Sequence, residues 1–155
     1  MTMPDVIAEL SLPDLGATER FAAQVAPLLG PGDVVALDGA LGAGKTVLCR
    51  AIIQALGYSS DVPSPTFTLL QIYDLKCPVW HMDLYRLEKP EEAFELGIEE
   101  GFETAACLIE WPSKLGPYLP PGFLTLRLEH GADAGTRKLT IIGDDTWAQR
   151  VRGIV

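Results

Sequence analysis

A short glycine-rich segment carries the residue types that bind phosphate. It runs from Gly39 to Thr46 as Gly-Ala-Leu-Gly-Ala-Gly-Lys-Thr and fits the pattern of a glycine, four variable residues and Gly-Lys-Ser/Thr. Glycines let the backbone wrap closely around phosphate oxygens with its N–H groups pointing inward. Lys45 can place an ammonium between the β- and γ-phosphates, and the Thr46 hydroxyl is suited to ligate Mg²⁺. The segment therefore predicts a nucleoside triphosphate site.

The residues on either side of this segment have the patterns of a strand and a helix. Residues 33–37 include the apolar Val34, Val35 and Leu37, and residues 47–56 have helical periodicity. A helix that begins at the glycine-rich segment adds its partial positive charge to the phosphate site. The alternative is a strand-to-helix turn without a ligand. The match at every fixed position and at both flanks favours the nucleotide site.

Two acidic residues end later strand-like runs. Asp83 lies in the strand candidate 79–84, and Glu110 directly follows the apolar run 107–109. In parallel sheets, ligands gather at the carboxyl ends of the strands. An acidic residue that ends a buried strand is the Walker-B arrangement, so Glu110 is the better Mg²⁺ candidate, against the alternative of a carboxylate exposed on a loop. Either carboxylate can position an attacking water.

Other polar and aromatic residues have less specific patterns. The segment 64–67 offers hydroxyls on a proline-stiffened loop, where Thr66 either contacts the γ-phosphate or lies in a turn that enters a strand. Trp111 follows Glu110, so its ring either borders the nucleotide or a partner, or covers the edge of the core. Neither His81 nor His130 is expected to have a catalytic role.

The order of elements predicts a single three-layer α/β/α domain with a P-loop NTPase fold and a mostly parallel sheet that ends in antiparallel strands. An acidic face on the expected helix 90–103 is either solvated surface or a binding site. We expect strands at 6–10, 33–37, 67–73, 79–84, 105–109, 123–128 and 138–142, and helices at 18–29, 47–56, 90–103 and 146–151. The last two strands are expected to form a hairpin.

Composition limits the classes of partner and compartment. The 155 residues include 12 Lys and Arg against 21 Asp and Glu, a net charge of −9, which disfavours direct capture of RNA or anionic lipid. Three widely spaced cysteines in apolar surroundings indicate reduced, buried thiols, so we expect a cytoplasmic protein. The chain shows no apolar run long enough to cross a bilayer, and no membrane partner is expected.

Four segments together resemble one family, the TsaE (YjeE) ATPases of bacterial tRNA threonylcarbamoyladenosine synthesis. The resemblance extends from about Leu12 to Pro121. Its marks are Leu-Gly-Ala-Gly-Lys-Thr at 41–46, Ser-Pro-Thr-Phe-Thr-Leu at 64–69, His-x-Asp-Leu-Tyr-Arg-Leu at 81–87 and Leu-Ile-Glu-Trp-Pro at 108–112. The order and spacing of these motifs are highly specific.

The resemblance implies a Mg²⁺·ATP site. It implies that Thr46 and Glu110 hold Mg²⁺ and that Thr66 lies in a switch-like loop. It also implies that Asp83 is a carboxylate critical for activity, in addition to the catalytic Lys45. Residues implied along the nucleotide are Leu15, Thr18, Leu41, Gly42, Ala43, Gly44, Lys45, Thr46, Trp111 and Gly135. The family commonly has Asp where this chain has Ala40, which removes only a side-chain contact because phosphate cradling uses main-chain N–H groups.

The resemblance also implies partners. Family members act with TsaD and TsaB, which transfer threonylcarbamoyl to tRNA, so tRNA would be reached only through the complex. The expected activity is a slow, partner-dependent ATPase. The alternatives are a small P-loop kinase that phosphorylates a metabolite and a nucleotide sensor that does not hydrolyse ATP; the acidic and proline-rich candidate lid regions argue against the kinase.

Overall fold

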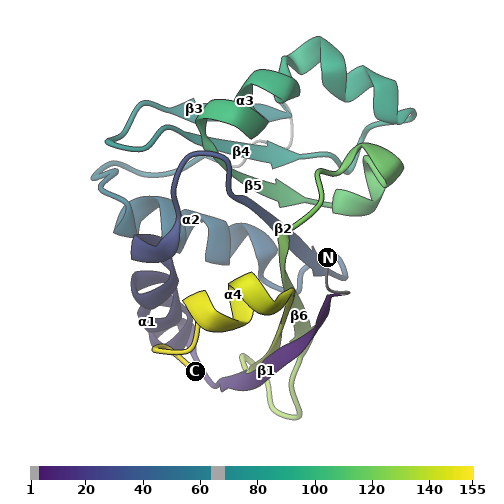
Figure 1. Cartoon of the computed structure of the whole chain (residues 1–155). Coiled ribbons are helices and arrows are strands. Elements are labelled where there is room, and N and C mark those ends of the chain that lie inside the picture. The colour runs from purple at the N-terminus through teal and green to yellow at the C-terminus, as the bar shows by residue number, and fades with distance from the viewer. Residues whose placement is uncertain (1–3, 64–68) are drawn as a thin grey trace.

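One seven-stranded sheet runs through the structure, a computed structural model that describes residues 4–63 and 69–155 (Figure 1). The strands are β1 (Asp5–Leu12), β2 (Val34–Gly39), β3 (Leu70–Tyr73), β4 (Val79–Asp83), β5 (Ala106–Glu110), β6 (Leu124–His130) and β7 (Arg137–Gly143). Their order in the sheet is β1-β7-β6-β2-β5-β4-β3. The strand that enters the glycine-rich segment, β2, is therefore the middle strand.

The centre of the sheet is parallel and its two flanks are antiparallel. β2 pairs in parallel with β5 and β6, and β5 pairs in parallel with β4. The hairpin β6–β7 and the pairs β1–β7 and β3–β4 are antiparallel. β5 is buried along its whole length, as its near-continuous apolar run indicates for a strand covered on both faces. The predicted fold, with antiparallel strands at the C-terminal end, is confirmed.

Helices cover both faces of the sheet and complete three layers. The helical segments are α1 (Leu15–Val25), η1 (Ala26–Leu28), α2 (Lys45–Ala55), η2 (Pro90–Leu96), α3 (Ile98–Thr104), η3 (Pro112–Lys114), η4 (Gly116–Tyr118) and α4 (Asp145–Arg150). One apolar core joins α1, α2 and α4 to the sheet, and a second core joins η2, α3 and the segment that follows β5. In Figure 1, α1 and α2 lie on one side of the strands and α3 on the other.

Three expected elements differ most from the structure, and the others are shifted by one or two residues at their ends. α1 begins at Leu15 because the Asp14 carboxylate accepts a hydrogen bond from the Ala17 N–H and caps the helix. The expected helix 90–103 is broken at Gly97, which has the left-handed conformation (φ 77°), so a 3₁₀ segment precedes α3. The first part of the expected strand 67–73 lies outside the described residues, and β3 begins at Leu70.

Side chains alternate across the strands, and this alternation places polar groups on the α2 side of the sheet. On β5, Leu108 packs into the core with α1 and α2, whereas Ile109 packs into the opposite core. Because successive strand side chains point to opposite faces, Glu110 faces the same side as Leu108. On β4, Val79 belongs to the α2 core, so His81 and Asp83 also face α2.

The structure agrees in part with the expectation that the cysteines are reduced, buried thiols. The three cysteines are free; Cys49 and Cys107 are buried as expected, but Cys77 is only partly buried because it lies in the turn before β4. The long helices α1 and α2 have 11 residues each. Over residues 4–63 and 69–155, no helix is both long and apolar enough to cross a membrane.

Candidate nucleotide site

The glycine-rich segment forms the turn between β2 and α2. Gly39, Gly42 and Gly44 have φ values of 146°, 80° and 104°, which residues with a side chain rarely adopt. At Gly39 a Cβ would also lie 2.5 Å from the Leu128 carbonyl oxygen on β6. Gly44 is the N-cap of α2, so the partial positive end of the helix opens at this turn.

A cavity of about 330 Å³ lies in front of the turn. Its walls come from the turn and α2 on one side and from the ends of β4 and β5 on the other. The lining residues are Leu41, Gly42, Gly44, Lys45, Thr46, Val47, Asp83, Tyr85, Arg86, Glu110 and Trp111. The strand ends therefore meet the glycine-rich turn, as parallel β/α connections dictate.

Lys45 is held at the edge of this cavity by two contacts. Its Nζ donates to the Gly39 carbonyl at 2.5 Å and lies 3.5 Å from the centroid of the Trp111 ring. Burial lowers the pKa of Lys45, and the carboxylates of Glu110, Asp38 and Asp83 oppose this shift. The ammonium is thus partly desolvated among acidic groups, a setting in which an added phosphate would be strongly attracted.

A chain of hydrogen bonds joins α2, β5 and β4 beside the turn. Thr46 Oγ1 donates to Glu110 Oε1 at 2.8 Å, and Glu110 Oε2 lies 2.8 Å from His81 Nε2. Cys49 Sγ belongs to the same buried group, in which the possible ligand atoms of Cys49, His81 and Glu110 all lie within 4.8 Å of one another. Burial raises the pKa of the Cys49 thiol, which disfavours it as a metal ligand. The oxygens of Thr46 and Glu110 are the better ligands for a hard cation such as Mg²⁺.

Asp83 and Trp111 complete the cavity wall next to Glu110. Asp83 is opposite Glu110 in the parallel pairing of β4 with β5, and its Oδ1 accepts a hydrogen bond from the Tyr85 N–H at 3.1 Å. Trp111 has a left-handed conformation (φ 59°, ψ 54°), which is unusual for a bulky residue. This conformation places its ring over Lys45 and 5.0 Å from the Tyr85 ring centroid.

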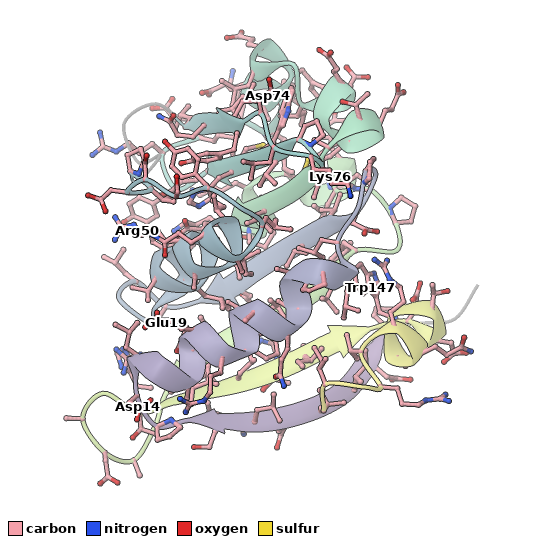
Figure 2. All side chains as sticks on the ribbon, turned by 90° about the vertical axis from the view of Figure 1, so that its left-hand side faces the viewer. Asp14, Glu19, Arg50, Asp74, Lys76 and Trp147 are labelled. Carbon is pink, nitrogen blue, oxygen red and sulfur yellow. The ribbon has the colours of Figure 1, made fainter. Side chains whose placement is uncertain are left out.

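A second cavity of about 270 Å³ adjoins the first at Gly44 and Val47. Its lining residues are Asp14, Leu15, Thr18, Ala43, Gly44, Val47, Leu128, Gly135 and Arg137. Figure 2 labels Asp14 where α1 begins, at the rim of this cavity. Arg137 Nε donates to the Ala43 carbonyl at 3.0 Å and so ties β7 to the glycine-rich turn.

The residues that the sequence singled out lie around these two cavities. The turn residues 41, 42 and 44–46, with Asp83, Glu110 and Trp111, line the first; Leu15, Thr18, Ala43 and Gly135, again with Gly44, line the second. Thr66 lies outside the described residues. Ala40 is exposed in the turn, and its carbonyl accepts a hydrogen bond from the Ala43 N–H.

Sequence reasoning missed two residues of this region. No catalytic role was predicted for His81; it is buried on β4, as a packed strand residue is, and it contacts Glu110. Its spacing of two from Asp83 on a strand was the available signal, because both side chains then share a face. Arg137 had no local signal, since its contact with Ala43 depends on the hairpin register of β6 and β7.

Comparison with known proteins gives a family match over most of the chain. The family described as threonylcarbamoyl adenosine biosynthesis protein TsaE matches residues 12–139. A Treponema pallidum protein named tRNA threonylcarbamoyladenosine biosynthesis protein TsaE is 40% identical over 125 residues, covering 80% of this chain and 92% of its own. The Bacillus subtilis protein of that name is 38% identical over 118 residues, covering 75% and 73%.

A solved structure has the same fold. The crystal structure of Bacillus subtilis YdiB superposes with a TM-score of 0.79 at 26% sequence identity. The superposition covers 99% of this chain and 95% of that one. The arrangement of sheet, glycine-rich turn and helices is therefore the P-loop fold over the whole length compared.

Proposed function

Because this chain belongs to the TsaE family of threonylcarbamoyl adenosine biosynthesis proteins, we propose that it binds Mg²⁺·ATP and hydrolyses it slowly to support modification of tRNA. Family membership supports the pathway, and the residues around the first cavity support the chemistry. The observation that carries the chemistry is the 2.8 Å contact of Thr46 Oγ1 with Glu110 Oε1 beside the glycine-rich turn.

The donor set at this contact fits magnesium. Thr46 and Glu110 offer a hydroxyl and a carboxylate oxygen, the hard ligands that Mg²⁺ takes beside phosphate oxygens. These two residues would hold the ion, and the ion would neutralise negative charge on the phosphates. No soft ligand is needed, and the protonated Cys49 thiol does not compete.

The phosphates would lie along the glycine-rich turn. Its main-chain N–H groups and the N-terminus of α2 supply positive ends of dipoles, and Lys45 would exchange the Gly39 carbonyl for phosphate oxygens. Because Lys45 is partly desolvated before the ligand arrives, its charge acts in a medium of low polarity, where it stabilises a transferring phosphoryl group strongly.

The nucleoside would occupy the second cavity. Leu15, Val47 and Leu128 give this cavity apolar walls suited to a base, and Thr18 adds a hydroxyl. Since both cavities share Gly44 and Val47, one extended ligand can lie in both. This placement agrees with the expectation that Leu15, Thr18 and Gly135 lie along the nucleotide.

The partners in this proposal are TsaD and TsaB, with tRNA held by the complex. A large apolar side chain is exposed beside the nucleotide site: Leu41, in the glycine-rich turn, is 72% exposed. Such a residue beside a catalytic site suits contact with another protein. The net charge of −9 leaves this chain poorly suited to hold RNA itself.

Calorimetry with Mg²⁺·ATP tests the binding part of the proposal. Lys45→Ala should weaken binding by about 10- to 150-fold, the loss expected for hydrogen bonds from a charged group. Lys76→Ala is the matched control, because Lys76 is exposed in the turn at the far end of β4 (Figure 2). Equal affinity of wild type and Lys45→Ala would contradict the assignment of the phosphate contact.

Phosphate release tests the catalytic part. The chain alone should turn over at about 10⁻⁴ to 10⁻² per second, by analogy with GTPases that lack a complete set of transition-state donors. Added TsaD and TsaB should raise this rate. Phosphoryl transfer to a metabolite without partners would identify a kinase instead, and binding without phosphate release even with partners would identify a nucleotide sensor.

A further inference from the structure

We propose that His81 is a positioning residue for the metal site: its bond to Oε2 of Glu110 fixes the carboxylate so that Oε1 is presented to Thr46 and the cation. This inference rests on the proposed Mg²⁺·ATP site and adds to it a residue that does not touch the ligand. It also gives a function to a histidine for which the sequence predicted no catalytic role.

The two oxygens of Glu110 have different partners, which together fix its orientation. Oε1 accepts from Thr46 Oγ1 at 2.8 Å, and Oε2 lies 2.8 Å from His81 Nε2. A carboxylate can only accept a hydrogen bond, so Nε2 must be the donor. Glutamate has three rotatable side-chain bonds, and holding one conformer has an entropy cost that a second contact offsets. With His81 present, Glu110 is already set before a cation arrives.

Because His81 is buried, its ring has no access to water and depends on protein groups for its hydrogen bonds. His81 is 0% exposed and Glu110 is 2% exposed. Within residues 4–63 and 69–155, the other ring nitrogen, Nδ1, has no hydrogen-bond partner. The bond to Glu110 is therefore the polar contact that the described structure gives this ring. A buried polar ring is costly where an aliphatic side chain would pack equally well, so the contact it makes needs an explanation.

Lys45 explains why the orientation of Glu110 matters. Among the nearby carboxylates, Glu110 raises the pKa of the Lys45 ammonium most, because the two opposite charges attract each other. Without the His81 bond, this attraction would compete with the contact between Glu110 and Thr46. The metal ligand would then be weakened, whereas the main-chain phosphate cradle would be unchanged. Residues that orient metal ligands in this way typically contribute about 10- to 100-fold in metal affinity.

The test compares ADP affinity with Mg²⁺ and with EDTA. In His81→Leu, the ratio of the two affinities should fall by about 10-fold or more, whereas affinity in EDTA should stay within about twofold, since the phosphate cradle is intact. His81→Gln places an amide donor near the position of Nε2 and should restore most of the ratio. In a Glu110→Gln background, His81→Leu should have no further effect, because His81 acts through that carboxylate.

The controls separate this inference from the proposed function. His130→Leu removes the exposed second histidine and should leave the ratio unchanged. If wild type binds neither ATP nor ADP with Mg²⁺, the proposed function itself fails. If wild type shows the Mg²⁺ enhancement and folded His81→Leu shows the same enhancement, only the role of His81 is overturned. Equal losses in Mg²⁺ and in EDTA would indicate a merely structural residue and also overturn it.

Histidine NMR keeps the inference testable if His81→Leu does not fold. The chain has two histidines, so ¹⁵N-histidine labelling with His130→Gln assigns the ring of His81. Its Nε2–H resonance should shift when Mg²⁺ is added to the ADP complex, because the cation withdraws electron density from Glu110. A His81 resonance that does not respond to Mg²⁺ would contradict the inference.

Discussion

Glu110 and Asp83 lie opposite each other on β5 and β4 but have different surroundings. The two oxygens of Glu110 are engaged by Thr46 and His81. Asp83 lines the cavity, and its Oδ1 accepts the Tyr85 N–H. Glu110 is therefore better suited to hold a cation. In the mechanism that we propose, Asp83 would orient a water molecule at the phosphate, a role that sequence patterns left open between the two residues.

Asp83→Asn should separate binding from hydrolysis. The amide oxygen of the variant side chain can still accept from the Tyr85 N–H, so the loop and Mg²⁺·ATP affinity should stay within about threefold of wild type. Loss of the charge that orients or deprotonates water should lower single-turnover phosphate release by about 10²-fold. Glu110→Gln is the comparison and should chiefly reduce Mg²⁺-dependent affinity. A reversed pattern in the two variants would exchange their roles.

The residues that could be predicted are those whose signal is local. The glycine-rich turn and the two strand-end carboxylates follow from patterns of fewer than ten residues, and the structure places them around one cavity. His81 and Glu110 are 29 residues apart, and Arg137 and Ala43 are 94 apart. Such contacts depend on strand order and register, which local patterns do not contain.

At the scale of elements, helix ends and breaks were the least predictable features. Apolar periodicity predicted the strands β2 and β5 and the helix α2. The middle residues of each predicted range lie in the corresponding element of the structure. The break at Gly97 divides η2 from α3, although the acidic pattern of 90–103 is continuous. A glycine within a helical pattern is compatible with either continuation or a stop, and packing of Ile98 into the second core selects the stop here.

At Gly101, α3 packs closely against the Trp80 side chain of β4. A Cβ at this position would lie 2.5 Å from a ring carbon of Trp80, which packs beneath the helix. Gly101→Ala should therefore reduce the free energy of unfolding by about 1–3 kcal/mol, as overpacked cores do. In an open helical position the same change would instead be stabilising.

Urea denaturation measures this effect. Glu103→Ala is the matched control, since Glu103 is exposed on the same helix and its change should be within about 0.5 kcal/mol. An unfolding free energy of Gly101→Ala equal to or above that of wild type would show that α3 does not press on Trp80.

At the scale of the whole molecule, residues 4–63 and 69–155 form two apolar cores separated by the sheet, and each core contains a buried thiol. Cys49 belongs to the core with α1 and α2, and Cys107 belongs to the core with α3. That two cores exist could be predicted from the alternation of strands and helices. The strand order could not, because the chain crosses the sheet several times before β6 and β7 return beside β2.

Alkaline pH should destabilise the fold through Cys107. Burial raises the pKa of this thiol from 9.0 to about 12. Between these values the unfolded chain releases a proton that the folded chain retains, so the free energy of unfolding falls as pH rises. The contribution of this thiol is full below about pH 9 and decreases by up to about 1.4 kcal/mol per pH unit above it.

Denaturation by urea between pH 8 and 10.5 in reducing buffer measures how steeply the free energy of unfolding falls with pH. Cys107→Ala should be less stable at pH 8, because it leaves a small cavity, yet should lose less stability with rising pH than wild type. Parallel slopes for the two proteins would show that the thiol of Cys107 is not desolvated in the folded state.

The two cavities share Gly44 and Val47, and in the proposed function this boundary would divide the nucleotide between separate parts of the chain. In the proposed placement, magnesium and the phosphates would be held by the glycine-rich turn and the end of β5, whereas the nucleoside would lie against α1 and the turn 131–136 of the β6–β7 hairpin, which contributes Gly135 to the second cavity. Exchanging that turn is thus a route to engineer a preference for guanine or a synthetic base analogue, with the ion-binding machinery carried over intact.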